Sequence, residues 1–393
     1  MFSRMHVGIV ESFFLIFAGA AVLAAAALYT RQPLLVAYIA VGGIAGPHGL
    51  GWVTDSTMIS ETSEFGIIFL LFLVGLDLQP SKLRNMIGSS IVTALASSAA
   101  FFAVTAGVML AFGFSMTDAI VAGTACMFSS TIVGLKLLPT TVLHHRHIGE
   151  LVVSLLLIQD LIAILTLIIL SGRGATMAGA VGSIVSVFVA LPSLVAAAFV
   201  LVRYLVLPLI HKFDAFHEFI FLAAIGWCLA VACVAKIIGL SFEIGAFVAG
   251  VAMATSPIAQ YIAENLRPLR DFFLVMFFFS VGAAIHFDLM VQVAAPAIVL
   301  ALLLIAMKPL VFRALIAWQG DSTKVAWEAG VRLGQTSEFS LLVAYLATSV
   351  ALMSNAASHV VQGATVLTFV ISTYIVIFRY PSPIAISERL RRN

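Results

Sequence analysis

Charged residues and cysteines are scarce in this chain. Asp, Glu, Lys and Arg make up 10% of the 393 residues, whereas soluble globular domains carry about 25%. Hydrophobic residues reach 62% and the mean hydropathy is +1.15, which leaves no stretch polar enough for a soluble domain. The three cysteines lie in apolar runs without metal-binding spacing, so we expect no disulfide and no metal knuckle. The composition predicts an all-α polytopic membrane protein with no cofactor and no nucleic-acid partner.

Long apolar runs fill most of the sequence. A run of about 20 apolar residues crosses a bilayer as a helix. The first run is longer than a signal-peptide core, so we interpret it as a retained span. We expect about 13 transmembrane helices, near residues 9–28, 34–50, 62–79, 87–113, 117–138, 148–171, 178–208, 217–238, 242–255, 268–287, 292–317, 325–350 and 357–379.

The positive charges are divided unevenly between the two sides of this arrangement. With the N-terminus outside, 15 of the 20 Lys and Arg residues fall on the inner side, and three (Arg4, Arg173 and Lys236) fall on the outer side. Cytoplasmic loops are enriched in Lys and Arg. The bias therefore predicts an outer N-terminus and a cytoplasmic C-terminus.

The two halves of the chain resemble each other. Residues 37–46 resemble residues 245–254, and residues 67–78 resemble residues 274–285. The copies lie seven predicted spans apart, so they cross the membrane in opposite directions. Inverted repeats are typical of secondary transporters with a midplane site. We therefore predict two inverted six-helix repeats at 1–173 and 213–380, a linker span at 174–212 and a short cytoplasmic tail at 381–393.

One carboxylate lies at the centre of the apolar run 151–170. Asp160 follows Gln159 in the sequence LLLIQDL. A charge at mid-bilayer depth costs about 3 kcal/mol or more, so such a residue is a candidate functional site. We interpret Asp160 and Gln159 as a cation- and proton-binding site. The alternative is a structural Asp that pairs with a neighbouring helix.

Two predicted spans have polar centres. Backbone unwinds at membrane depth only where it lines a cavity or is buried in protein. Interrupted spans at corresponding positions of two repeats point to a transporter's binding site. We expect the first of the two polar groups to bind a cation with Asp160, and the second to support the broken helices around the site. For the first group alone, ordinary helix–helix hydrogen bonding is the alternative. The groups are Ser129, Ser130 and Thr131 in one span, and Gly334, Gln335, Thr336, Ser337 and Glu338 in the other.

Other ionisable residues lie within or beside the spans. Lys308 needs a partner in the bilayer, and Asp160 is the natural candidate; snorkelling to the surface is the alternative. We expect Glu338 to cap a helix or to pair with a neighbour such as Arg332. Asp77 fits a charge at a helix end.

Three histidines, His144, His145 and His147, lie in the loop before the Asp160 span. Histidine titrates near neutral pH, so this tract is a candidate pH sensor and a weaker candidate metal tract. We favour a solvated polar loop.

Several motifs occur in the order typical of one transporter family. They are FLLFLVGLDLQPSKLR (69–84), the Ser129–Thr131 break, LLLIQDL (155–161), EIGAFVAGV (243–251), FFFSVGAAI (277–285) and GQTSEFSLLV (334–343). From about residue 30 to 380 the chain resembles the monovalent cation:proton antiporter family (CPA2), and within it the Kef-type potassium/proton antiporters.

This resemblance implies a homodimer in a bacterial inner membrane, surrounded by lipids, with a core that moves like an elevator. Asp160 would bind a proton and a cation in turn. Gln159 stands where electrogenic sodium/proton relatives carry a second Asp, which implies electroneutral one-for-one exchange. The Gln-Asp pair implies potassium as the cation. Lys308 matches the buried basic residue of the family's core.

The sequence departs from the Kef-type pattern at residues 334–339, which read GQTSEF in place of GQGGEF. This change bears on ion preference. Only residues 381–393 follow the last span, so the sequence gives no basis for inferring gating by nucleotides or glutathione adducts. A further C-terminal regulatory domain and a regulatory subunit are both left open.

Other functions are open from the residues alone. The same antiporter could carry sodium. A gated potassium efflux channel would need rings of carbonyls from several subunits. An intramembrane aspartyl protease would need two facing aspartates, and an organic-anion symporter a larger cavity. We predict a transporter and not an enzyme.

Overall fold

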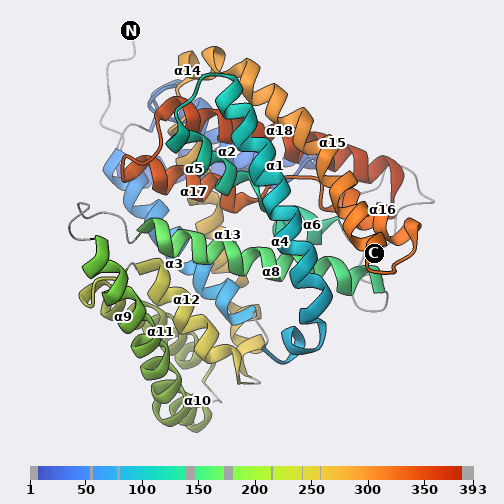
Figure 1. The fold of residues 1–393 in the computed structure, drawn as a ribbon. Coiled ribbons are helices and arrows are strands. Elements are labelled where there is room, and N and C mark those ends of the chain that lie inside the picture. Colours follow the sequence, from blue (N-terminus) through green and yellow to red (C-terminus); the bar gives the residue numbers. More distant parts are fainter. Residues whose placement is uncertain are drawn as a thin grey trace. The chain divides into compact units, whose positions relative to one another are not determined.

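A computed structural model describes residues 8–53, 56–77, 80–137, 147–171, 180–213, 216–240, 242–256 and 258–382. Within these residues every regular element is a helix (Figure 1). The prediction of an all-α protein is therefore confirmed.

The chain divides into two compact units. Unit 1 comprises Met1–Val53, Met86–Leu167 and Val281–Asn393, and unit 2 comprises Thr54–Asn85 and Ile168–Ser280. Unit 1 contains α1 (Ile9–Tyr29), α2 (Leu34–Ala45), α5 (Met116–Cys126), α6 (Thr131–Lys136), α14 (Phe287–Gln292), α15 (Ala294–Trp318), α16 (Thr323–Arg332), α17 (Glu338–Ser349) and α18 (Asn355–Arg379). Unit 2 contains α3 (Ser56–Asp77), α9 (Ala180–Leu201), η1 (Val202–Val206), α10 (Leu207–Lys212), α11 (His217–Ile237) and α12 (Phe242–Ala254). Three long helices contribute residues to both units: α4 (Pro80–Ala111), α8 (His147–Ser171) and α13 (Ile258–Ala283).

Apolar helices dominate the described residues. Five shorter ones of 10–17 residues accompany seven that are long and apolar enough to cross a membrane. The seven are Ile9–Tyr29, Ser90–Ala111, His147–Leu167, Val189–Lys212, Glu218–Ile237, Ala294–Trp318 and Asn355–Arg379. The chain is therefore an integral membrane protein. The total of about 13 spans and the inverted repeats stay predictions.

The interior of unit 1 is built around α18. This helix packs against α2, α5, α14, α15, α16 and α17 (Figure 1). The apolar stretches of the membrane-length helices differ in how many of their residues are buried. The share is 79% in the α8 stretch and 61% in the α18 stretch, but only 17% in the α1 stretch. Gly330 permits the close packing of α16 on α15, because a Cβ there would lie 2.6 Å from the Pro309 carbonyl oxygen. Small residues at such contacts let helix backbones approach closely in membranes.

Unit 2 is organised by the pairing of α3 with α12. Gly75 on α3 faces Gly250 on α12, and a Cβ at Gly250 would collide with the Phe72 carbonyl. Helices α9 and α11 pack on the same α12. Helices α3 and α12, which carry the repeat-motif residues 67–77 and 245–254, thus pack against each other in this unit.

Candidate functional site

Two helical paths in unit 1 are interrupted at the polar residues expected from the sequence. The chain leaves helical geometry between α5 and α6, at residues 127–130, and between α16 and α17, at residues 333–337. A serine hydroxyl stabilises the start of the second helix in each case. Ser130 Oγ accepts from the Val133 amide at 3.0 Å, and Ser337 Oγ accepts from the Phe339 amide at 3.1 Å. Such caps satisfy amide donors that a helix start leaves unpaired.

Direct hydrogen bonds join the two interruptions. Ser129 Oγ donates to the Leu333 carbonyl at 2.9 Å. Gln335 Nε2 donates to the Ser130 carbonyl at 3.4 Å. Residues far apart in the sequence thus form one buried polar centre within unit 1.

Lys308 on α15 links the same two interruptions from a third helix. Its ammonium donates to the Phe128 carbonyl and, at 3.1 Å, to the Gln335 carbonyl. The side chain is fully buried, so the snorkelling alternative is wrong. The expected ion pair with Asp160 is also wrong, since neither carboxylate oxygen lies within ion-pair distance of Lys308. Breaking a helix frees carbonyl oxygens, and these oxygens take the place of the carboxylate as acceptors for Lys308.

Asp160 and Gln159 reach the centre from α8. Thr131 Oγ1 lies 3.1 and 2.9 Å from the two carboxylate oxygens of Asp160. Gln159 Oε1 accepts from the Ser129 amide at 3.0 Å. Both α8 side chains are buried, and the charge of Glu338 is close enough to interact with that of Asp160. The predicted residues Gln159, Asp160 and Ser129–Thr131 therefore lie together.

Two hydroxyl residues of α18 belong to this centre and were missed in the sequence. Thr368 Oγ1 accepts from the Thr336 amide at 3.1 Å and lies 2.7 Å from Thr336 Oγ1. Ser372 Oγ donates to Gln335 Oε1 at 2.9 Å. Single hydroxyls are common in membrane helices, so only their repeated spacing along one face of α18 could have indicated a role.

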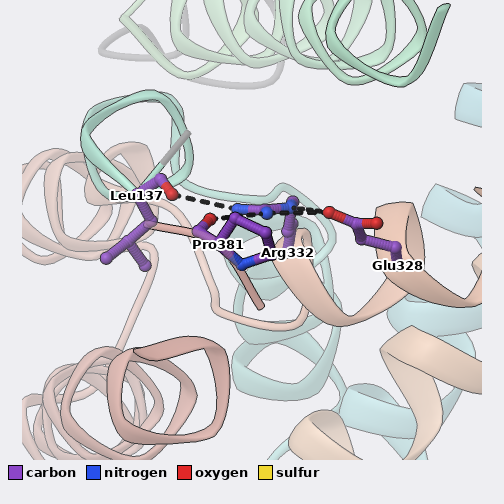
Figure 2. Close-up of polar contacts among 4 residues, drawn as sticks. All are labelled: Leu137, Glu328, Arg332 and Pro381. Carbon is purple, nitrogen blue, oxygen red and sulfur yellow. Dashed lines mark hydrogen bonds and ion pairs between the residues drawn. The ribbon is translucent and has the colours of Figure 1, made fainter. Parts of the chain in front are cut away.

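Arg332, at the end of α16, lies just outside the centre. Figure 2 shows its guanidinium between Glu328, Leu137 and Pro381. Nε and Nη2 donate to Glu328 Oε1 at 3.0 and 2.8 Å, Nη1 donates to the Leu137 carbonyl at 2.9 Å, and Nη2 donates to the Pro381 carbonyl at 2.9 Å. The suggested pairing with Glu338 is therefore wrong, because Glu328 lies one helical turn earlier on the same face.

The remaining predicted residues fall into three groups. Gly334 lies in the interruption, where its amide donates to the Val331 carbonyl at 3.2 Å. Helix α3 ends at Asp77, in agreement with a helix-end charge, but the side chain of Asp77 lies outside the described residues. Of the three histidines, His144 and His145 also lie outside them, whereas His147 is exposed and 2.7 Å from Asp321.

The atoms of this centre that could bind a cation are all oxygens. They are carboxylate, amide, hydroxyl and backbone carbonyl oxygens, which hard cations prefer. The Asp160 carboxylate also binds a proton reversibly. The centre therefore has the groups to hold either a small cation or a proton.

Comparison with known proteins gives one family. The transmembrane model of the sodium/hydrogen exchangers matches residues 12–378. K(+) efflux antiporter 4 of Arabidopsis thaliana is 31% identical over 350 residues, which cover 86% of this chain and 58% of the relative. The protein named iron transporter MagA, of Paramagnetospirillum magneticum, is 26% identical over 88% of this chain and 79% of its own length. The chain thus spans little more than half the length of the first of these relatives.

A solved structure has a similar fold. The sodium proton antiporter MjNhaP1 from Methanocaldococcus jannaschii, determined at pH 8, matches with a TM-score of 0.71 and 14% identity. The match covers 98% of this chain and 97% of the other. At this identity the likeness concerns the fold alone, and it agrees with the antiporter-like fold expected from the sequence.

Proposed function

Because the chain belongs to the sodium/hydrogen exchanger family, and within it to the Kef-type CPA2 antiporters, we propose that it exchanges potassium for protons across a membrane. The observation that carries the proposal is the position of Asp160. This carboxylate is buried on α8, bonded to Thr131, next to two interrupted helices that Lys308 ties together. A buried carboxylate among oxygen donors suits a transporter that binds a cation and a proton at one place.

In this mechanism the two ions compete for Asp160. The ionised carboxylate binds potassium with Thr131, Gln159 and oxygens of the interruptions, and protonation expels the cation. One carboxylate that takes either one cation or one proton gives electroneutral one-for-one exchange. Gln159 supports this stoichiometry, because its neutral amide holds the Ser129 backbone without adding a second charge beside Asp160.

The remaining parts of the proposal concern architecture. We propose two inverted repeats, at 1–173 and 213–380, joined by a linker span at 174–212, which move as an elevator in a homodimer. The interruptions at 127–130 and 333–337 support the repeats, since they lie at corresponding positions of the two halves. We place the N-terminus outside and the C-terminus in the cytoplasm, in a bacterial inner membrane.

Sodium is the second candidate cation. The family's description and the name of the structural neighbour both refer to sodium. The potassium proposal is supported by the Gln159–Asp160 pair and by the name of the Arabidopsis relative.

The test is proton exchange in proteoliposomes that contain a pH-sensitive dye. Potassium, sodium or lithium is added to equal pH gradients, first at zero membrane potential and then at an imposed potential. The proposal expects potassium to collapse the gradient fastest, at a rate that the potential does not change. A faster response to sodium reassigns the cation, and a rate that follows the potential contradicts electroneutral exchange.

A further inference from the structure

Interrupting a helix in the bilayer interior leaves backbone groups that need partners. The amide of Thr336 is such a group, because it lies between α16 and α17, and the whole residue is buried. An unsatisfied buried amide costs about 1–3 kcal/mol. Its partner is not in either half-helix but on α18, where Thr368 Oγ1 accepts its hydrogen at 3.1 Å.

The direction of each hydrogen bond at Thr368 follows from counting protons. Thr368 donates its single hydroxyl proton to the Thr365 carbonyl at 2.8 Å. The 2.7 Å contact between the two threonine hydroxyls is therefore donated by Thr336. Thr368 Oγ1 thus donates once and accepts twice, from the amide and the hydroxyl of Thr336. The interruption is held at this residue by one atom of α18.

Ser372, one turn further along α18, fixes the next side chain. Ser372 Oγ donates to Gln335 Oε1 at 2.9 Å, which directs Gln335 Nε2 toward the Ser130 carbonyl. The Gln335 carbonyl accepts from Lys308 at 3.1 Å. The orientation of the Gln335 amide, and with it the hydrogen bond from Gln335 to the Ser130 carbonyl, depends on the Ser372 hydroxyl.

We propose that Thr368 and Ser372 are positioning residues of the cation site, so that α18 sets the geometry of the interrupted helix. The effect on transport rests on the proposed function. Thr368 is hydrogen-bonded to Thr336 and Thr365, and Ser372 to Gln335, so each hydroxyl acts on the site through the residue it holds. Loss of the Thr368 hydroxyl leaves the Thr336 amide buried without an acceptor, and residues 335–338 then shift until that amide finds one.

The test compares matched variants on one helix. Thr368→Val removes the hydroxyl and keeps the side-chain shape, and Thr368→Ser keeps the hydroxyl. Thr373→Val is the control, because Thr373 is fully buried on α18 and its hydroxyl has no partner among the described residues. Ser372→Ala is the second test variant.

For transport, we expect Thr368→Val and Ser372→Ala each to raise the half-saturating potassium concentration about tenfold, the equivalent of one buried hydrogen bond. Thr368→Ser and Thr373→Val stay within about twofold of the wild type. A merely structural role would instead lower the amount of active protein, and so the maximal rate, at an unchanged half-saturating concentration. That result overturns the proposal, as does an equal effect of Thr373→Val.

Hydrogen exchange separates this inference from the proposed function. In detergent-solubilised protein, we expect peptides covering residues 333–339 to exchange about tenfold faster in Thr368→Val than in the wild type or Thr373→Val, because the Thr336 amide has lost its acceptor. If no cation drives proton transport in the wild type, the proposed function fails, and the hydrogen-exchange comparison still decides the role of Thr368. Equal amide hydrogen exchange at residues 333–339 in all three proteins overturns the positioning role of Thr368.

Discussion

The hydroxyl of Thr131 bridges both carboxylate oxygens of Asp160, at 3.1 and 2.9 Å. This contact joins the first residue of α6 to the centre of α8, so the carboxylate is tied to the interruption and not only to its own helix. Thr131 has one proton to donate, and it stabilises the ionised form of Asp160.

Replacing Thr131 tests this role. We expect Thr131→Val to raise the half-saturating potassium concentration about tenfold or more, because hydrogen bonds to charged groups contribute about 1.5–3 kcal/mol. Dye-based exchange in proteoliposomes measures the change. Thr131→Ser, which keeps the hydroxyl, is the control and should stay near the wild type; equal behaviour of the Val and Ser variants would contradict the role.

Lys308 offers a prediction about stability. We expect Lys308→Met to lower the free energy of unfolding by about 2–4 kcal/mol, because the Phe128 and Gln335 carbonyls lose their donor in the protein interior. The thermal midpoint in detergent measures this loss. Lys324→Met is the control, since Lys324 is exposed and substitutions at such positions change stability by about 0.5 kcal/mol or less. A wild-type midpoint for Lys308→Met would show that the carbonyls do not depend on the ammonium.

Arg332 holds three segments together through its fork of donors (Figure 2). Lys has no planar fork, so Arg332→Lys should retain at most part of the contacts to Glu328, Leu137 and Pro381. We expect Arg332→Lys to lower the free energy of unfolding by about 2–3 kcal/mol, measured from the thermal midpoint in detergent, and to speed proteolysis after residue 380.

Glu328→Gln is the matched comparison for Arg332. The Glu328 side chain is 26% exposed, so water can solvate the group that replaces the carboxylate. We therefore expect Glu328→Gln to lower the free energy of unfolding by about 1 kcal/mol or less. If Glu328→Gln lowered the free energy of unfolding as much as Arg332→Lys, the contacts of Arg332 with the Leu137 and Pro381 carbonyls would contribute nothing to stability.

Tyr380 gives a prediction at alkaline pH. Burial raises the pKa of its hydroxyl above the usual value of about 10, and the charge of Glu328 raises this pKa further. The charges of Arg379 and Arg332 lower the pKa by less, so it stays above the usual value. The folded protein holds this proton more tightly than the unfolded chain does. The stabilisation is therefore complete below about pH 10 and is lost as the pH rises through the folded pKa.

We accordingly expect the melting temperature of the wild type to fall more steeply above about pH 10 than that of Tyr380→Phe, which has no proton to lose. A melting series from about pH 8 to 11 in detergent measures both. Tyr29→Phe is the control, since Tyr29 is 92% exposed. Identical slopes for the wild type and Tyr380→Phe would contradict the prediction.

The sequence located the main residues of the centre because polar groups are conspicuous in apolar spans. Asp160, the Ser129–Thr131 group and the Gln335–Glu338 group interrupt long hydrophobic runs, and burying such groups is costly enough to indicate a shared site. The helical interruptions at 127–130 and 333–337 follow from the same residues.

Partners could not be predicted from the sequence in the same way. The expectation of a Lys308–Asp160 pair was based on opposite charges alone. The interrupted helices, however, supply free carbonyls that satisfy an ammonium without a carboxylate. Thr368 and Ser372 carry no charge, and their role depends on which face of α18 meets the interruption. Glu328, the partner of Arg332 in the structure, was not considered, although an i, i+4 spacing on a helix favours such a pair over the suggested Glu338.

Competition at Asp160 is the central claim, and the pH dependence of potassium affinity tests it most directly. The half-saturating potassium concentration is measured in proteoliposomes across a series of pH values, for the wild type and for Asp160→Asn, with Asp288→Asn as an exposed control. Because one proton and one cation compete for one carboxylate, the account predicts that this concentration rises about tenfold for each unit of acidification below the carboxylate's pKa, at a constant maximal rate. It also predicts no exchange in Asp160→Asn. A concentration that stays constant while the maximal rate falls, or proton-coupled exchange that persists in Asp160→Asn, would contradict the account.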